Sequence, residues 1–222
     1  MIRNDYIMRM IEQLTVALAN IAGLKVNHKY EEGLQRANEA FKDIFGLSAE
    51  TIDSLDYKAL IYLIGSNDVS GRAKCLIVAE LLKERAEVYK ALNKYDESLS
   101  CYLKSISIYI EMVLAEKELI QEYANKIEDI YKKINKYQIP RDSLFLLFRF
   151  FEDTGRYAKA EDTLFEILGD HSQDKTVVNE GISFYKRLKE KDEAELIKGN
   201  LPMDEVIEGL NKLENVENRV SP

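Results

Sequence analysis

A stretch of 68 residues without glycine or proline constrains this chain more than any other feature of its sequence. The stretch covers residues 72–139, between Gly71 and Pro140, and the whole chain of 222 residues has only 10 glycines and 3 prolines. Glycine and proline mark the tight turns between strands, whereas the interiors of long helices avoid both. The sequence therefore predicts an all-α fold built from long helices.

Composition and charge exclude several classes of partner. Hydrophobic residues make up 46% and charged residues 32% of the chain, which is typical of a soluble protein with a substantial core. The net charge of −8 opposes binding to nucleic acid, which needs clustered lysine and arginine. The longest uncharged stretch, residues 13–24, is shorter than the ~18–20 residues of a membrane span, and acidic residues before it argue against a signal peptide. We therefore expect a cytoplasmic protein that binds neither nucleic acid nor membrane.

Apolar residues recur at steps of three and four along most of the chain, which is the spacing of one helix face. In the first helix this stripe consists of Ile7, Ile11, Leu14, Leu18 and Ile21. Further helices are expected at about 30–45, 72–93, 95–110, 119–134, 140–153, 157–168, 175–190, 191–198 and 203–213. We predict one domain over residues 1–222, with two short helices and a loop inserted at 48–71 and a frayed tail at 214–222.

A basic residue followed by tyrosine stands between helical stretches at four places. The four pairs are Lys29–Tyr30, Lys94–Tyr95, Lys136–Tyr137 and Arg156–Tyr157. The residues before three of them suit the left-handed conformation that ends a helix; they are Asn93, Asn135 and Gly155. Three residues after a tyrosine stands a small side chain, namely Gly33, Ser98 or Ala160. We expect each tyrosine to fill the wedge between two antiparallel helices, while the small residue lets them approach closely.

The segment 79–106 resembles a tetratricopeptide repeat (TPR), a helix–turn–helix unit of 34 residues. The matching positions are Ala86, Tyr89, Tyr95, Ser98, Tyr102 and Ser105. "GRYAKAEDTLFEIL" (155–168) is a second match, Ala194 follows Ala160 by 34 residues, and 29–41 is a weaker match. Phe148 at a usually small position and Lys191 in place of a turn tyrosine depart from the pattern. The resemblance implies a TPR-like α-solenoid, a right-handed superhelical stack of antiparallel helix pairs.

A second resemblance covers nearly the whole chain. "MIRNDYIMRMIEQL", "KYEEGL", "AELLKERAEVY" and "TGRYAKAEDTLFEIL", in this order, are similar to an uncharacterised bacterial family of about this length that carries a domain of unknown function. This resemblance implies no catalytic residue, ligand or partner, so it bears on the fold and leaves the function open.

Residues capable of chemistry are few. Cys75 and Cys101 lie inside helical patterns and are expected to be buried thiols, with neither a disulfide nor a metal site between them. His28 and His171 stand beside predicted turns, and Asp68 lies in a loop that lacks the rest of a calcium or phosphate motif. We therefore predict no enzyme activity, no cofactor and no metal.

The concave face of stacked helix pairs is the surface on which repeat proteins bind partners. Carrying the repeat positions across, the candidate groove residues are Lys83, Glu87, Lys90, Phe145, Arg149, Glu152, Asn179, Ser183, Lys186 and Arg187. Their cations can meet the acids or terminal carboxylate of a peptide, and Phe145 offers an apolar anchor. Glu87 stands where the carboxylate clamp of chaperone-binding repeats requires asparagine. The competing interpretation is that all ten are solvated residues of a structural array.

The leading hypothesis is therefore a protein-interaction module that binds a peptide or a partner helix in this groove. One alternative is a homo-oligomeric scaffold, a homodimer for example, that assembles through the apolar stripe of the first helix. Another alternative is a small-ligand sensor or enzyme hosted by the helical array.

Overall fold

The computed structural model of the chain describes residues 2–66, 68–169 and 174–220, and the regular structure in these residues is entirely helical. The all-α prediction is therefore confirmed, whereas His171 lies outside the described residues. The chain divides into two compact units, Met1–Gln138 and Ile139–Pro222, called unit 1 and unit 2 below. The expectation of one domain over the whole chain stays a prediction.

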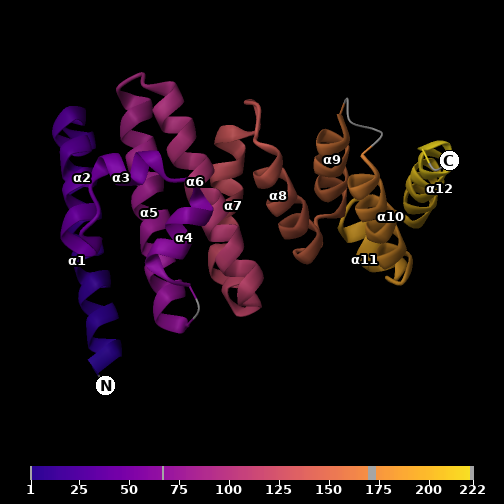
Figure 1. The fold of residues 1–222 in the computed structure, drawn as a ribbon, viewed down its shortest axis with the longest axis horizontal. Helices are drawn as coiled ribbons and strands as arrows, with labels where there is room; N and C mark the ends of the chain where they lie inside the picture. Colours follow the sequence, from indigo (N-terminus) through magenta and orange to yellow (C-terminus); the bar gives the residue numbers. More distant parts are fainter. Residues whose placement is uncertain (1, 67, 170–173, 221–222) are drawn as a thin grey trace. The chain divides into compact units, whose positions relative to one another are not determined.

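Unit 1 contains two long helical hairpins and a further helix that packs against the second hairpin (Figure 1). Its elements are α1 (Ile2–Val26), α2 (Tyr30–Phe45), α3 (Ala49–Ser54), α4 (Tyr57–Ile64), α5 (Val69–Ala91), α6 (Tyr95–Ala115), a 3-10 turn η1 (Lys117–Leu119) and α7 (Ile120–Ile134). The helix α5 lies at the centre, because it packs against α1 and α2 as well as α6.

The α5–α6 hairpin is closed by small residues. The Ser98 hydroxyl donates to the Ala86 carbonyl at 2.8 Å, and the Ser105 hydroxyl donates to the Ala79 carbonyl at 2.7 Å. Both serines are buried, and each gives its hydroxyl a partner on the opposite helix. This confirms the prediction that Ser98 lets the two helices approach closely. Ser105, two turns further along α6, makes the same kind of contact.

The predicted tyrosine wedge is confirmed at one corner and wrong at another. Tyr30 packs against a core cluster of α1, α2 and α5. Tyr157 is buried, and its hydroxyl donates to the Glu195 carboxylate. Tyr95, in contrast, is 53% exposed and its hydroxyl donates to the Asn93 side chain, so its ring does not fill that seam. The fourth tyrosine, Tyr137, is 36% exposed.

The predicted left-handed helix ends are also confirmed in part. Asn93 has φ 59° and Gly155 has φ 70°, both in the left-handed region. Asn135 has φ −61° and ψ −11°, so the prediction is wrong there. The chain instead leaves α7 through a right-handed turn, in which the Tyr137 amide donates to the Ile134 carbonyl.

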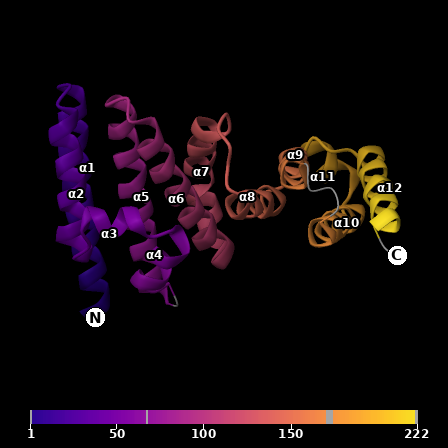
Figure 2. The ribbon, with the colours of Figure 1, turned by 45° about the horizontal axis from the view of Figure 1, so that its top comes forward.

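The inserted helices α3 and α4 lie beside the α5–α6 hairpin (Figure 2). Arg85 of α5 is 1% exposed, and its two terminal nitrogens donate to the Asp53 carboxylate at 2.9 and 2.8 Å. Lys104 of α6 donates to the backbone carbonyls of Ile52 and Asp53 at 2.7 and 2.9 Å. Cations from two long helices therefore hold the last turn of a six-residue helix that buries only Ile52.

The helix α1 turns its predicted stripe only partly inward. Ile21 is fully buried and Ile7, Leu14 and Leu18 are half-buried, whereas Ile11 is 40% exposed. By length and composition, α1 over Asp5–Val26 and α6 over Tyr95–Ala115 are each apolar enough to cross a membrane. In α6 most of that span is buried within the protein, whereas in α1 most of it is exposed.

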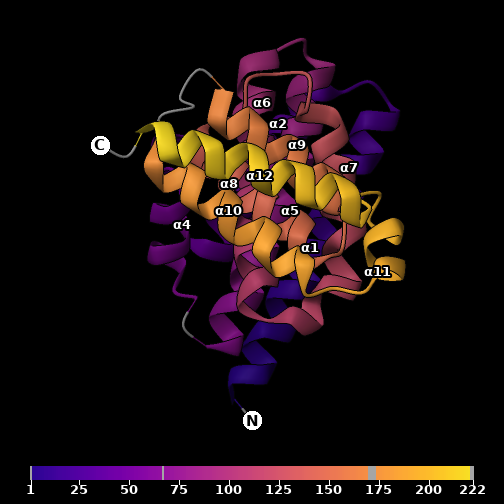
Figure 3. The ribbon, with the colours of Figure 1, turned by 90° about the vertical axis from the view of Figure 1, so that its right-hand side faces the viewer.

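Unit 2 consists of α8 (Arg141–Asp153), α9 (Tyr157–Leu168), α10 (Lys175–Lys189), α11 (Glu193–Lys198) and α12 (Met203–Val220). Its core is aromatic, with Phe148 of α8 against Phe184 of α10 at a ring distance of 5.3 Å. In Figure 3, α12 runs across α10, and the two helices are in contact. Gly209 makes this possible, because a Cβ there would lie 2.3 Å from the Tyr185 ring.

Two smaller predictions concern the tail and the cysteines. The helix α12 continues to Val220, so residues 214–220 are helical where the sequence suggested a frayed tail. Cys75 and Cys101 are buried and unbonded, as predicted. Burial raises the pKa of each thiol to about 11, which keeps both protonated at neutral pH.

The Arg85–Asp53 pair yields a stability prediction. We expect Asp53→Ala to lower the free energy of unfolding by about 2 kcal/mol, because it leaves a buried guanidinium without its carboxylate. Adding Arg85→Met removes the buried charge and should recover at least half of that loss. Urea unfolding monitored by circular dichroism measures both values.

The matched control is Asp129→Ala, which breaks an exposed pair with Lys132 and should cost about 0.5 kcal/mol or less. A double variant less stable than Asp53→Ala alone would contradict the idea that the unpaired buried charge causes the loss.

Candidate functional site

The ten predicted groove residues fall into both units. Lys83, Glu87 and Lys90 lie on α5 in unit 1, and the other seven lie on α8 and α10 in unit 2. Each unit therefore has its own candidate surface, and the two are described in turn.

On α5, two of the three candidates are already bound to neighbouring side chains. Lys83 pairs with Glu80 at 2.5 Å and with Glu84 at 3.3 Å, and Glu87 pairs with Lys133 of α7. The side chains of Lys83 and Glu87 are only 21% and 24% exposed. Engaging a peptide here would require these ion pairs to break.

Lys90 differs from its two neighbours on this stripe. It is exposed at the end of α5 and forms no ion pair with any residue that the structure describes. A single cation without an ion partner among the described residues does not make a binding site. The α5 stripe, defined by Lys83, Glu87 and Lys90, is therefore best understood as a structural part of unit 1.

The centre of the α5 stripe is Glu80, which the sequence analysis missed. Its carboxylate accepts from Lys126 at 2.7 Å, from Lys83 at 2.5 Å and from the Tyr109 hydroxyl at 2.5 Å. Burial raises the pKa of Glu80, but these three hydrogen bonds outweigh it and lower the pKa to about 2. The available signal was that Glu80 is the one charged residue in the otherwise apolar segment 75–82, but its partner Lys126 lies 46 residues away.

A further ion pair connects α5 to α1. Lys25 of α1 donates to Glu84 at 2.8 Å, and Glu84 also faces Lys83. Through Glu80, Glu84 and Glu87, the polar stripe of α5 therefore binds both α1 and α7. Partly buried, mutually paired charges of this kind fix helix positions and leave little for a ligand.

In unit 2 the seven remaining candidates form two adjoining stripes. Phe145, Arg149 and Glu152 follow one another at steps of four and three on α8. On α10, Ser183 follows Asn179 by four residues, and Lys186 and Arg187 follow Ser183 by three and four. The stripes meet where the Arg187 guanidinium donates to both Glu152 oxygens, at 2.7 and 2.9 Å, and the Phe148–Phe184 contact joins the same two helices.

Several groups on this face keep their binding capacity. Arg149 is exposed and has no ion partner among the described residues, and Lys186 has only Glu214 at 3.9 Å. Asn179 is exposed, and Phe145 is half-buried beneath the Arg141 guanidinium. The α8–α10 face, defined by these seven candidates, therefore offers cations and an aromatic ring on a supported surface.

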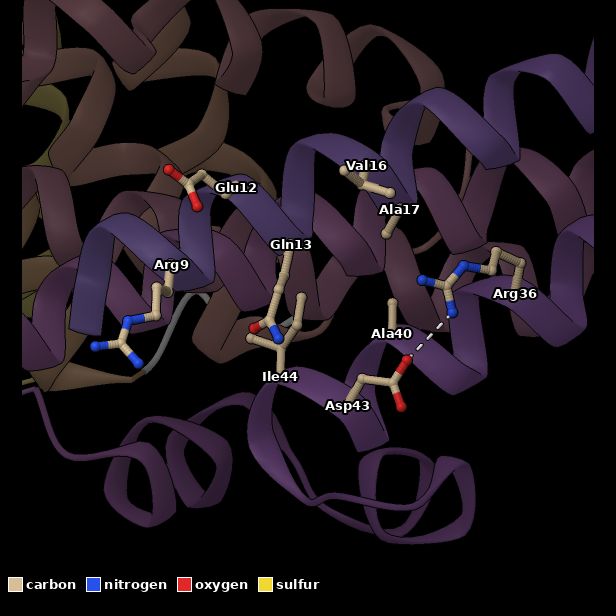
Figure 4. Close-up of a pocket in the computed structure, with 9 residues that line it drawn as sticks. All are labelled: Arg9, Glu12, Gln13, Val16, Ala17, Arg36, Ala40, Asp43 and Ile44. Carbon is tan, nitrogen blue, oxygen red and sulfur yellow. Dashed lines mark hydrogen bonds and ion pairs between the residues drawn. The ribbon is translucent and has the colours of Figure 1, made fainter. Parts of the chain in front are cut away.

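A hollow between α1 and α2 was not anticipated from the sequence (Figure 4). Its volume is about 590 Å³. Arg36 pairs with Asp43 at 3.2 Å at one end, and Arg9 lies at the other, beyond Gln13 and Ile44. In the parts of the chain that the structure describes, no group of three or more potential metal ligands occurs here or elsewhere.

Comparison with known proteins gives one match. A family model described as "Family of unknown function (DUF6483)" matches residues 1–218. No curated protein and no solved structure matches the chain.

The lowered pKa of Glu80 predicts acid sensitivity. A carboxyl with a folded pKa of about 2 and an ordinary value of 4.5 stabilises the fold fully above about pH 5. That contribution, of the order of 3 kcal/mol, is lost as the pH falls from 4.5 towards 2. Urea unfolding at a series of pH values should show it.

Glu80→Gln should be less stable at neutral pH and should flatten the acid limb of this profile. The control Glu118→Gln changes an exposed acid in η1 and should leave the profile as it is. Parallel acid limbs for the Glu80→Gln variant and the unaltered chain would refute the assignment.

Proposed function

The chain belongs to the DUF6483 family, and we propose that it is a non-enzymatic, cytoplasmic protein-interaction module. In this proposal it binds an acidic peptide segment on the α8–α10 face. The proposal keeps the predicted partner class but places the main contacts on unit 2, because Lys83 is paired with Glu80 and Glu84 of α5, and Glu87 is paired with Lys133 of α7.

We further propose that the helices belong to the TPR-like class, stacked as a right-handed superhelix of antiparallel pairs. Two features support this. The buried serines Ser98 and Ser105 stand at small positions of the repeat and join the two helices of one pair. In unit 2, Glu152 and Arg187 are 35 residues apart and join α8 to α10, close to the period of 34.

The observation that carries the functional proposal is the continuity of the α8–α10 face. Bidentate pairing of Arg187 with Glu152 joins the two stripes, and the buried rings of Phe148 and Phe184 hold the same two helices together. A surface fixed in this way loses little entropy when a ligand binds.

The chemistry of the face selects the ligand. Arg149 supplies a cation that has no ion partner among the described residues, and Lys186 supplies one whose ion pair with Glu214 is long, at 3.9 Å, whereas Glu152 is occupied by Arg187. The exposed amide of Asn179 can bond to a peptide backbone, and Phe145 can contact an apolar side chain. An extended or helical peptide with acids flanking an apolar residue fits these groups.

A charge-reversal experiment tests the proposal. Peptides selected against the chain from a displayed random library should be acidic, and Arg149→Glu with Lys186→Glu should weaken their binding at least about tenfold. Loss of two cations that pair with peptide carboxylates is the physical reason. Fluorescence anisotropy with the selected peptides measures the affinity.

The matched control is Lys198→Glu with Lys212→Glu, two exposed cations of the same unit that lie on α11 and α12, outside the two helices of this face. It changes the net charge equally and should alter the affinity by no more than about twofold. Equal losses in both double variants would reduce the effect to net charge and contradict the proposed site, as would a library that yields no binders.

A further inference from the structure

The helices α1 and α6 have the same apolar character but very different surroundings. Their candidate spans have equal mean hydropathy, yet 61% of the span in α6 is buried within the protein and only 17% of that in α1. Apolar surface of this extent on a soluble chain is normally covered by another surface. The question is which surface covers α1.

Two faces of α1 can be distinguished by exposure. Met10, Ala17 and Ile21 are at most 2% exposed and face the rest of unit 1. Met8, Ile11, Val16 and Val26 are between 40% and 78% exposed. Between these exposed residues lie further exposed small residues, Thr15, Ala19 and Ala22.

The exposed residues follow a helical pattern of their own. Met8, Thr15, Ala19, Ala22 and Val26 are separated by seven, four, three and four residues, which keeps them on one side of the helix. This spacing is that of helices that pack lengthwise against another helix. The name outer face is used below for these five residues with Ile11 and Val16.

Two charges beside the outer face point to a particular occupant. Arg9 and Glu12 have opposite signs, both are exposed, and neither has an ion partner among the residues that the structure describes. They line the same hollow, in which Arg36 and Asp43 of α2 are already paired with each other. A partner surface that carries the same two charges in reverse order would satisfy both.

We propose that the outer face is a homodimer interface, in which α1 packs antiparallel against α1 of a second copy across a two-fold axis. An antiparallel arrangement with Arg9 opposite Glu12 of the second copy creates two identical ion pairs by symmetry. It also brings Ile11 of both copies close to the axis, where the apolar contact is densest. The mate of each charge is supplied by the same sequence, so no other protein is needed.

A membrane surface fits the same face less well. Anionic lipid headgroups attract clustered lysine and arginine, whereas α1 carries Asp5 and Glu12 on its exposed side and the chain has a net charge of −8. The inference differs from the assembly alternative drawn from sequence, because buried Ile21 belongs to the inward stripe and not to the outer face.

Sedimentation equilibrium of the full chain tests the inference. The unaltered chain should sediment at twice its mass of 25.6 kDa. Arg9→Glu and Glu12→Arg, each alone, should raise the dimer dissociation constant about tenfold, because like charges then face each other. The two substitutions together restore opposite charges and should return the constant to within about threefold of its original value.

Circular dichroism of the three variants checks that the exposed substitutions leave the helices folded. A chain that is monomeric at its solubility limit would overturn the proposal. So would single variants that dimerise normally, or a double variant without recovery. A monomer that floats with vesicles of phosphatidylcholine and phosphatidylserine would assign the outer face to a membrane instead.

Discussion

Unit 1 depends on α5, a helix that packs on several sides at once and whose buried or half-buried charges have partners. Towards α6 it accepts hydrogen bonds from two buried serines, and towards α1 and α7 it presents paired acids. Arg85 holds the short helix α3. A buried charge without its partner costs several kcal/mol, so these pairs select one arrangement of the neighbouring helices over others.

Whether a charged side chain is already paired within the protein bears on where a partner is expected to bind. Polar groups that position helices are occupied by one another, as Glu80 is by two lysines and a tyrosine. Among the described residues, Arg149 on the α8–α10 face and Arg9 and Glu12 beside the outer face of α1 have no ion partner. We propose an acidic segment as the ligand of the first surface and a second copy of the chain as the partner of the second.

Much of the helical framework was predictable from local sequence, whereas the pairing of charges was not. Periodicity placed the long helices. The helix α3 follows Ser48, whose side chain accepts from the Thr51 amide, and serine before a helix is a local capping signal. Asp56 caps α4 through the Ala59 amide, whereas Asp53, three residues earlier, binds Arg85. That contact joins residues 32 apart in the chain, a distance at which no local pattern carries information.

The candidate site shows the same limit to local reasoning. Repeat positions correctly grouped Phe145, Arg149 and Glu152 on one stripe of α8, because helical spacing is local. They could not reveal that Glu87 is bound by Lys133, which lies 46 residues away. The wedge predicted for Tyr95 is also wrong. The Ser98 hydroxyl joins the two helices at this corner, and the Tyr95 ring is exposed.

Native-state hydrogen exchange, followed by mass spectrometry of peptides from the intact chain, tests the central role of α5 most directly. If α5 organises unit 1, its amides and those of α6 should exchange slowest in the unit and with one shared opening free energy. The amides of α1, α3 and α7 should exchange sooner, by openings that leave α5 and α6 protected. Exchange in α5 that is as fast as in α1 or α7 would contradict the account.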